Sequence, residues 1–501
     1  MVHDFLLLQV KNSVMNQEKD EKPRKSVAAK WEDFCSETTL HGFRAAFYSK
    51  NIYKRYFWRV LLVCATVLAI FLFYGVVDAY KKYEFKVSKE INFSMDDIEF
   101  PRVTICNLNS LSKMKLVQLG FTEEADDLID FYHKMRAMTL NISDPDTKRI
   151  LNLFYAKGMN TTHEIISAFD LGKNEMLNDE FLAKLIPKGV CSFEDQKCNM
   201  DNFTEIYSTK FGKCLVFPQE DSQPLMSTTQ GDGLSLFLNI HEDEMLDSRS
   251  IANGLVVFIH PHEETFQSAL SKRIFIQPGT ISDIHVTVSK LRSLPAPYKT
   301  DCGKKALRFI DESYGYSANL CAIDCISEMY YSTCKCLPSE LKMFVEENIE
   351  ECSMEKFDCF TKVYRGINNG RMYDKCQQKC PAPCYMESFT LQAGQIKIGT
   401  KFMYDKLALL MNISVEESKD FVSHNFVGIR IAYGDVMYTE ETLTPSVDWK
   451  TLLATIGGSL GLCLGCSFIT CCEFLVFCIT YALLKRKESS KSAKKTVDVV
   501  T

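Results

Sequence analysis

The chain has 501 residues, 46% of them hydrophobic, and a formal net charge of −6. Length and composition of this kind fit most classes of globular and membrane protein, and the weak acidity gives no indication of a nucleic-acid partner. The distribution of residues is more informative, because two apolar segments, 60–77 and 452–484, enclose a long and mostly polar stretch. This arrangement predicts a protein that crosses the membrane twice around one large domain.

The first apolar segment, 60–77, carries no charged residue. A run of about eighteen apolar residues is long enough to cross a hydrocarbon core as a helix. We predict a cytoplasmic region at 1–59 and the first transmembrane helix at 60–78. The earlier apolar run at 5–10 is too short for the core of a cleavable signal peptide, so the first span is expected to act as an uncleaved signal anchor.

Basic residues flank the outer ends of both apolar segments. By the positive-inside rule, they place both termini in the cytoplasm, with a tail at 485–501. We expect the protein to lie in the plasma membrane. The residues are Lys19, Lys22, Arg24, Lys25, Lys30, Arg44, Lys50, Lys54, Arg55 and Arg59 before the first span, and Lys485, Arg486, Lys487, Lys491, Lys494 and Lys495 after the second.

The region between the spans, 79–449, has the composition of an extracellular domain. Seven of the 21 cysteines lie in the tail or the spans, which leaves fourteen, an even number, in this region. Such cysteines favour disulfides in an oxidising compartment. The same region holds every Asn-x-Ser/Thr glycosylation sequence, at Asn92, Asn141, Asn160, Asn202 and Asn412. We therefore expect glycosylation at these five asparagines.

The cysteines divide the extracellular region into two parts. Cys106, Cys191, Cys198 and Cys214 form one group, and ten further cysteines lie between 302 and 384. In the second group, cysteines four residues apart fall on one helix face, so two antiparallel helices could be joined by a ladder of disulfides. A zinc site is the alternative, because close cysteine pairs also bind zinc. The extracellular placement disfavours it, and we expect no metal and no cofactor.

The secondary structure is expected to be mixed. Residues 123–185 have a helical pattern, whereas the apolar runs 234–240, 254–259, 274–276 and 284–288 are typical of strands in one mixed or antiparallel sheet. Another strand, at 426–433, leads toward the second span, so the sheet is expected to connect both spans. The fold class is therefore an α+β membrane protein.

The second span, predicted at 450–484, contains a stripe of small residues and one acid. Gly457, Gly461 and Gly465 are four residues apart, which permits close helix packing, and a packing seam is the simple explanation of the stripe. Glu473 lies deep in the apolar run, where a carboxylate is costly unless it faces water or a partner. In an oligomer, one glutamate per subunit would form a ring that attracts cations. These residues indicate a pore.

Residues 457–461 also fit the Gly-x-Ser-x-Gly pattern of serine hydrolases. That motif needs a strand before it, a helix after it and a soluble pocket beside it. Here the pattern lies inside a membrane span, so we expect no enzyme activity.

Several motifs along nearly the whole chain resemble the degenerin, epithelial sodium channel and acid-sensing ion channel superfamily. This resemblance implies a trimer of identical or related subunits, each with palm, finger, knuckle, ball and thumb regions, around a sodium-permeable pore that amiloride blocks. The finger would occupy about 107–213 and the thumb about 302–384. The motifs are His41-Gly42, Phe100-Pro101-Arg102-Val103-Thr104-Ile105-Cys106-Asn107, Gly212-x-Cys214, Gly233-Leu234, Pro278-Gly279 and the run from Gly457 to Ser467.

The resemblance also implies the disulfide pairing, which spacing alone leaves open. The pairs would be Cys106 with Cys214, Cys191 with Cys198, Cys302 with Cys384, Cys321 with Cys380, Cys325 with Cys376, Cys334 with Cys359, and Cys336 with Cys352.

The same resemblance assigns functional residues. The selectivity filter would be Gly465-Cys466-Ser467, with cysteine in place of the alanine or serine that is frequent at the middle position, which puts sodium selectivity in doubt. The pore lining would include Ala454, Thr455, Gly458, Gly461 and Glu473. Thr455 stands where acid-sensing relatives carry an aspartate, so calcium block at the pore mouth is in doubt.

Gating residues can be placed in the same way. His41-Gly42 would form a re-entrant loop that affects open probability, because non-helical backbone at membrane depth must line water or be buried in protein. Tyr298, at the base of the thumb, would contact Tyr80 or Tyr83 at the top of the first span. These tyrosines could equally mark the membrane interface.

The stimulus is predicted by elimination. Proton gating in the family depends on a histidine just after the first span, where this chain has Phe85-Lys86, and on carboxylates between finger and thumb. Here His241-Glu242-Asp243-Glu244 is followed by a shortened loop, 248–253, without extra acids. We therefore expect an extracellular neuropeptide ligand, by analogy with peptide-gated members. Proton gating, constitutive opening, mechanical tethering and sensitivity to bile acids stay open.

Two other classes share this topology. Trimeric ATP-gated channels lack the Phe-Pro-x-Val-Thr-x-Cys-Asn element, and the chain shows no lysine cluster placed for a triphosphate. A non-conducting surface receptor would explain the spans, glycans and disulfides but neither Glu473 nor the glycine stripe.

Overall fold

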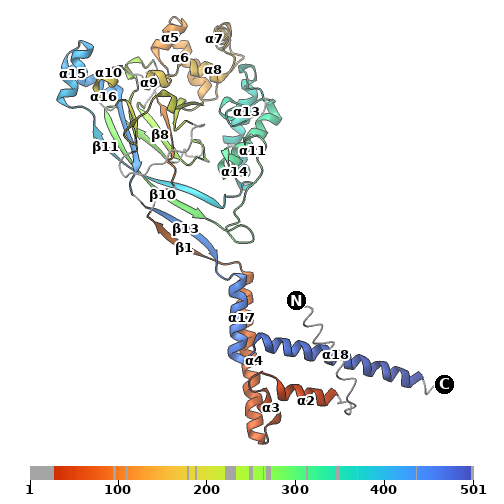
Figure 1. Cartoon of the computed structure of the whole chain (residues 1–501). Helices are drawn as coiled ribbons and strands as arrows, with labels where there is room; N and C mark the ends of the chain where they lie inside the picture. Colours follow the sequence, from red (N-terminus) through yellow and green to blue (C-terminus); the bar gives the residue numbers. More distant parts are fainter. Residues whose placement is uncertain are drawn as a thin grey trace. The chain divides into compact units, whose positions relative to one another are not determined.

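The computed structural model describes residues 27–497, except 94–97, 109–110, 178–179, 187–188, 220–232, 247–251, 263, 267–271, 312–313, 346–348, 369–370 and 436. The basic residues at 19–25 and part of the loop at 248–253 therefore lie outside the described residues. The chain divides into two compact units, one of residues 1–85 and 445–501 and the other of residues 86–444. Figure 1 labels the helices and strands of both units.

The first unit contains the two apolar segments. Helix α4 (Ile52–Lys81) is long and apolar enough to cross a membrane and includes the predicted span at 60–78. It begins earlier than predicted, because Asn51 caps it by accepting a hydrogen bond from the backbone N–H of Tyr53 at 3.0 Å. Two short helices, α2 (Val27–Glu37) and α3 (Phe43–Tyr48), precede it, and α17 (Trp449–Leu464) packs along it.

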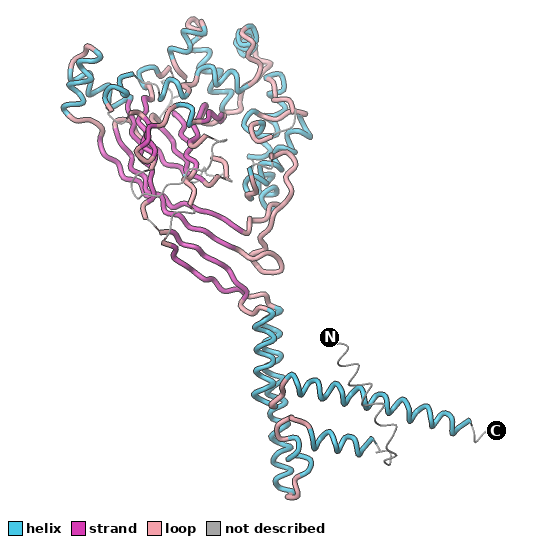
Figure 2. Tube along the Cα trace, in the orientation of Figure 1, coloured by secondary structure: helices cyan, strands magenta, loops and turns pink. Residues whose placement is uncertain are grey.

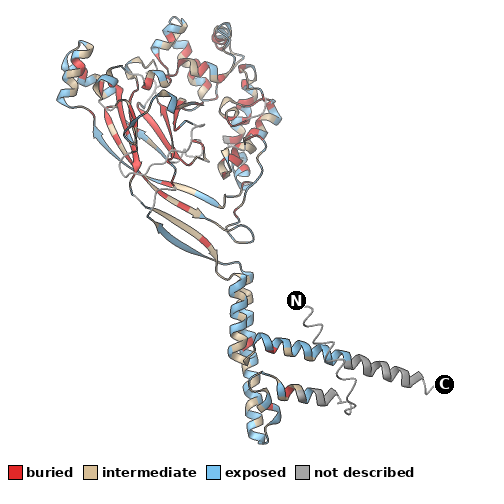
Figure 3. Cartoon of the chain, in the orientation of Figure 1, coloured by how far each residue is buried: buried red, intermediate tan, exposed pale blue. Residues whose placement is uncertain are grey.

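The second span is broken, which corrects the prediction of one helix from 450 to 484. Helix α17 ends at Leu464, and α18 (Phe468–Val497) starts after a three-residue gap at an angle of 78°. Most side chains of α4, α17 and the described part of α18 are exposed in the single chain (Figure 3). Apolar helices with so little burial are typical of elements that face lipid or neighbouring subunits.

The larger sheet of the second unit runs in the order β1-β13-β10-β12-β7-β3-β4, with β11 also paired to β10 (Figure 2). Its long central strand β10 pairs in parallel with β12 and β13 and antiparallel with β11. The bounds are β1 (Phe85–Asn92), β3 (Cys191–Phe193), β4 (Gln196–Lys197), β7 (Leu234–Asn239), β10 (Thr280–Arg292), β11 (Tyr385–Lys397), β12 (Phe426–Tyr433) and β13 (Tyr438–Pro445).

This sheet continues into both spans along the chain. Strand β1 follows α4 almost directly, β13 precedes α17, and the two strands are neighbours in the sheet. The connection to the spans is thus made by β1, which is mostly exposed, and β13, which is half-buried, and the apolar pattern predicted neither strand. At this point the backbone N–H of Ser446 donates to the carbonyl oxygen of Glu84 at 2.9 Å.

A second sheet corrects the prediction that all the apolar runs belong to one sheet. Its order is β5-β6-β2-β8-β9, with bounds β2 (Arg102–Asn107), β5 (Thr204–Ser208), β6 (Gly212–Phe217), β8 (Leu255–His260) and β9 (Arg273–Ile276). The apolar runs at 254–259 and 274–276 therefore separate from those of β7, β10 and β12. Apolar side chains of both sheets share one core, in which Val103, Leu236 and Val427 are buried. Because this core is buried from both sides, the sequence pattern alone does not assign a run to either sheet.

Short helices form the finger region. They are α5 (Lys113–Leu119), α6 (Ala125–Arg136), α7 (Pro145–Ala156), α8 (Thr162–Phe169), α9 (Lys173–Leu177) and α10 (Glu180–Leu185). Their limits follow from local capping: Asp144 caps α7, and Thr161 forms a capping box with Glu164 at the start of α8. Two more helices, α15 (Lys401–Met411) and α16 (Val415–Asn425), lie between β11 and β12 along the chain.

The thumb region consists of α11 (Ala318–Cys334), α12 (Ser339–Lys342), α13 (Phe357–Asn368) and α14 (Arg371–Gln378). Among the described residues, seven disulfides join the same pairs that the resemblance implies. Cys321–Cys380 and Cys325–Cys376 connect α11 to α14 and its C-terminal end, as in the expected ladder. Finger and thumb share an apolar core that includes Phe154, Leu337 and Phe357.

Candidate pore and ligand-binding site

The break in the second span begins at a glycine. Gly465 ends α17 with φ 64°, in the left-handed region, and its N–H donates to the carbonyl oxygen of Gly461 at 2.9 Å. Glycine adopts this conformation at little cost, whereas a side chain would be strained there. The predicted filter Gly465-Cys466-Ser467 is therefore the non-helical link between the two halves of the span.

The helix that follows is capped by its own first residues. The backbone N–H of Thr470 donates to Ser467 Oγ at 3.3 Å, and the backbone N–H of Ser467 donates to Thr470 Oγ1 at 3.2 Å. This reciprocal pair has the form of a capping box, and it satisfies donors that the start of a helix leaves unpaired. Ser467 therefore fixes where α18 starts.

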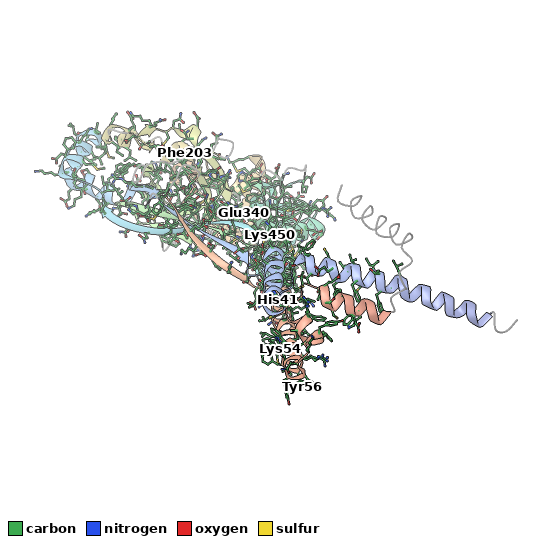
Figure 4. The ribbon with its side chains drawn as sticks, turned by 60° about the horizontal axis from the view of Figure 1, so that its bottom comes forward. His41, Lys54, Tyr56, Phe203, Glu340 and Lys450 are labelled. Carbon is green, nitrogen blue, oxygen red and sulfur yellow. A yellow bond between two sulfur atoms is a disulfide. The ribbon has the colours of Figure 1, made fainter. Side chains whose placement is uncertain are left out.

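A segment before the first span completes the break. The backbone N–H of His41 donates to the carbonyl oxygen of Leu464 at 3.1 Å, and the hydroxyls of Thr39 and Thr470 lie 2.8 Å apart. Gly42 has φ 81°, beside the ring of Trp58, and this turn starts α3. Figure 4 shows His41 among these helices of the first unit. The predicted His41-Gly42 turn thus lies directly against the predicted filter.

Aromatic contacts hold the same segment to α18. The rings of Phe34 and Phe477 are stacked with centroids 4.5 Å apart, and Trp31 lies 5.7 Å from Phe477. The break is thereby packed on one side by residues that precede the first span. Sequence reasoning missed Thr39, Thr470 and this aromatic cluster, because the contacts join residues more than 400 positions apart.

Glu473 is half-buried and bonded to the same segment. Its Oε2 accepts hydrogen bonds from the backbone N–H of Thr39 at 3.3 Å and from Thr39 Oγ1 at 3.2 Å. These bonds partly compensate the cost of a carboxylate at membrane depth. Its role in a ring of cation-attracting carboxylates stays a prediction.

The other predicted pore residues lie on α17. Ala454, Thr455 and Gly458 are exposed in the single chain, and Gly461 is half-buried. Thr455 Oγ1 donates to the carbonyl oxygen of Thr451 at 2.7 Å, so its hydroxyl bonds to its own helix. The exposed residues are free to line a pore or to pack against another subunit.

The predicted gating tyrosines divide between the two units. Tyr80 and Tyr83 lie at the end of α4, with ring centroids 6.2 Å apart, and Tyr83 has φ 49°. Tyr298 belongs to the other unit, on the loop after β10 that contains the cis bond Ala296–Pro297. Its contact with Tyr80 or Tyr83 stays a prediction.

The second unit, residues 86–444, contains a cavity of about 500 Å³. It is lined by α8 of the finger, by β5 and β6, and by thumb residues in and around α12. Two of its polar atoms, His163 Nδ1 and Tyr207 Oη, are buried and have no hydrogen-bond partner among the described residues. Lys213 and Lys342 add positive charge, whereas Glu205 and Glu351 add negative charge. The volume of this cavity is within the usual range for ligand sites. Because buried polar atoms normally have hydrogen-bond partners, the two unsatisfied atoms suit a small polar ligand.

Two carboxyl groups lie near this cavity, of which Asp170 is buried and Glu340 is half-buried. Asp170 accepts hydrogen bonds from the backbone N–H of Lys213 at 2.9 Å and from Tyr132 Oη at 3.3 Å. Burial raises its pKa to about 7, although Arg136 and these hydrogen bonds oppose the shift. Glu340, labelled in Figure 4, accepts from Thr209, and burial raises its pKa as well. Sequence reasoning missed both groups, because nothing in the sequence shows that the fold removes these two carboxyl groups from solvent, wholly at Asp170 and partly at Glu340.

Comparison with known proteins agrees with these features. The family model described as amiloride-sensitive sodium channel matches residues 34–477. Acid-sensing ion channel 1C of Danio rerio is 26% identical over 479 residues, which cover 91% of this chain and 84% of the relative. Acid-sensing ion channel 2 of Homo sapiens is also 26% identical, with 91% and 86% covered. The bile acid-sensitive ion channel of Mus musculus is 24% identical over 470 residues, which cover 90% and 87%.

Proposed function

Because this chain belongs to the amiloride-sensitive sodium channel family, we propose that three copies, or this chain with related subunits, form a ligand-gated sodium pore in the plasma membrane. Members of the family form trimeric channels that conduct sodium ions and are blocked by amiloride. The observation that carries the proposal is the break in the second span at Gly465-Cys466-Ser467. Unwound backbone at membrane depth is tolerated where it lines water or is buried in protein, and its carbonyl groups can then replace the water around an ion.

The proposed conduction path follows the exposed face of α17. Ala454, Thr455 and Gly458 would line its upper part, and Gly465 to Ser467 would form the narrowest part. Glu473, below the break, would contribute negative charge near the filter, and its hydrogen bonds to Thr39 would fix its position. The hydrogen bond from His41 to Leu464 couples the segment before the first span to the filter. The same contact makes this segment a candidate gating element.

For the stimulus, we propose a small extracellular peptide. A peptide carries charged or amidated ends together with backbone donors and acceptors. The cavity between finger and thumb offers partners for such groups in Tyr207, His163 and side chains of both charges. A bile acid is the alternative suggested by the name of one relative. The charged side chains of both signs in the lining favour the peptide, because its two ends and its backbone can pair with them and a sterol body cannot.

Protons are the second candidate stimulus, and one observation favours them. Asp170 is buried with a pKa raised to about 7, so it would bind a proton under mild acidification. The names of several relatives refer to acid sensing. Proton gating is disfavoured by Phe85-Lys86, which lies just after the first span, where gating by protons in the family depends on a histidine. The part of the acidic loop at 247–251 lies outside the described residues.

The experiment is expression of the full chain in oocytes under voltage clamp. Amidated neuropeptides, acid and a bile acid are applied in turn, first in sodium and then with sodium replaced by a large organic cation. We expect a peptide-evoked current that requires sodium and that amiloride blocks. A current evoked by acid or by bile acid alone would overturn the peptide proposal. Surface protein without current under all stimuli would contradict a homomeric channel and require coexpression with related subunits.

A matched pair of variants tests the cavity. Tyr207→Phe removes the unpartnered hydroxyl and should weaken activation by the peptide, so that a higher concentration is needed for half-maximal current. Tyr330→Phe alters another buried tyrosine of the same unit, outside the lining of the cavity, and should leave activation unchanged. Equal effects of both variants would argue against ligand binding in the cavity.

A further inference from the structure

The break in the second span brings two cysteine side chains together. The sulfur atoms of Cys466 and Cys471 lie 3.7 Å apart. Cys466 immediately precedes the capping residue Ser467, and Cys471 is the fourth residue of α18. In many helices these two positions carry apolar side chains that pack together across the first turn. Here both positions carry thiols, and one of them belongs to the predicted filter.

The surrounding contacts fix this pair. The reciprocal hydrogen bonds between Ser467 and Thr470 set the first turn of α18, and Thr470 is only 2% exposed. The hydroxyl of Thr39 bonds to that of Thr470. The backbone N–H of Cys471 donates to the carbonyl oxygen of Ser467 at 3.1 Å. The two thiols are therefore held close by the same contacts that shape the break.

Two adjacent thiols have a specific binding chemistry. Thiolates are soft ligands that select soft cations such as Cu(I). Among the residues that the structure describes, no group of three or more histidine, cysteine or carboxylate side chains could hold a metal ion. Within one chain, the described residues therefore offer two sulfur ligands at this place, and two sulfur ligands suit a soft monovalent cation.

We infer that Cys466 and Cys471 form a two-thiolate site for a soft monovalent cation, Cu(I), within each subunit, and that occupation of this site reduces sodium current. On binding, each thiol releases one proton to water, and two sulfur–copper bonds form without any change of oxidation state. The two thiolates and the bound ion together carry one net negative charge, and the two sulfur–copper bonds tie the filter to the first turn of α18, so the link loses the freedom to rearrange during opening. The effect on current rests on the proposed channel function, whereas the binding itself does not.

The first test measures binding to the purified full-length protein. Cu(I) is added under ascorbate, and a chromophoric Cu(I) chelator competes for it. We expect one tightly held Cu(I) per chain, lost in both Cys466→Ser and Cys471→Ser. Cys472→Ser is the matched control, because Cys472 is an exposed free cysteine next to Cys471 on the same helix, and this variant should bind as the wild type does.

The second test measures current in the same variants. Cu(I) should reduce the wild-type and Cys472→Ser currents, the chelator should restore them, and the two serine variants of the pair should be insensitive. Binding that is lost only in Cys466→Ser would indicate a site made by Cys466 of several subunits and would overturn the pair. Binding that survives both substitutions would overturn it as well. If the wild type binds Cu(I) but carries no current, the site stands and the proposed homomeric channel fails.

Discussion

Asp170 is a carboxyl group that the fold buries completely, and burial raises its pKa to about 7 from an ordinary value of 3.8. A carboxyl group with a raised pKa binds its proton more tightly in the folded than in the unfolded state. Its contribution to stability is therefore fully present below the unfolded pKa and is lost as the pH rises through about 7. The free energy involved is on the order of a few kcal/mol.

We predict that Asp170→Asn removes this pH dependence. Relative to the variant, the wild-type protein should become more stable by a few kcal/mol as the pH falls from about 7 to about 4. Thermal unfolding of the full-length protein in detergent, followed by intrinsic fluorescence at several pH values, measures the difference. A constant difference between the two proteins across this range would show that Asp170 does not titrate there.

The comparison with Asp170→Asn is needed because the titration of His260 changes the stability of the folded protein in the opposite direction as the pH falls. Burial lowers the pKa of His260 from 6.5 to about 4, so its contribution to stability is lost as the pH falls through this range. Its two ring nitrogens lie 3.1 Å from Thr104 Oγ1 and 3.0 Å from the carbonyl oxygen of Pro261. The stability of the wild type as a function of pH contains the contributions of both Asp170 and His260. The difference in stability between the wild type and Asp170→Asn contains the contribution of Asp170 alone.

At the scale of elements, the break between α17 and α18 depends on Gly465. A Cβ atom added there would overlap the imidazole of His41, and the positive φ would strain the backbone by about 1–2 kcal/mol. We predict that Gly465→Ala displaces the His41 segment and abolishes or strongly changes the current at normal surface expression. Voltage clamp combined with surface labelling measures both quantities.

Two further variants sharpen this prediction. Gly75→Ala is the matched control, because Gly75 lies in α4 and an added Cβ meets no atom of the chain within 4 Å. His41→Ala combined with Gly465→Ala removes the overlap but keeps the backbone strain, so it should recover part of the current. If Gly75→Ala and Gly465→Ala have equal effects, contact with His41 is not what Gly465 provides.

The disulfide ladder of the thumb gives the second prediction for an element. Cys325–Cys376 closes 51 residues between α11 and α14, whereas Cys191–Cys198 closes only seven. Because a longer closed loop restricts the unfolded chain more, replacing both cysteines of the longer pair by serine should cost about 2–5 kcal/mol. Replacing the shorter pair should cost less. Thermal unfolding and the yield of folded protein compare the two variants, and a larger loss for Cys191–Cys198 would contradict the argument.

The sequence predicted some elements well and others incompletely, for physical reasons. The spans, the strands β7, β8, β10 and β12, and the helical finger follow local apolar patterns. The strands β1 and β13 carry no such pattern: β1 is mostly exposed and is held only by its neighbour β13, and β13 is half-buried and also pairs with β10. The break in the second span was not predicted, because glycines at this spacing also fit a packed helix. Its actual determinants, the cap by Ser467 and the hydrogen bonds from Thr39, are contacts that hydropathy does not record.

At the scale of the whole molecule, we expect the disulfide-rich region between the two spans to fold outside the cytosol, because disulfides form and persist in oxidising compartments. The five glycosylation sequences are an independent test of this placement, because asparagines are glycosylated in secreted or extracellular regions. Asn141, Asn160, Asn202 and Asn412 are exposed, whereas Asn92 is half-buried. The side-chain nitrogen of Asn92, to which a glycan would be attached, donates to Glu440 Oε2 at 3.4 Å.

We predict glycans at the four exposed asparagines and little or none at Asn92. Substitution by aspartate tests each site, because aspartate keeps the side-chain oxygen with which Asn141 and Asn202 accept backbone hydrogen bonds. It also tolerates the positive φ of Asn412. Each of the four variants should lose one step of the mass shift that a peptide N-glycosidase produces, and Asn92→Asp should lose none. A shift lost in Asn92→Asp would show that this site is modified before β1 pairs with β13, and no shift at all in the wild type would contradict the extracellular placement of 79–449.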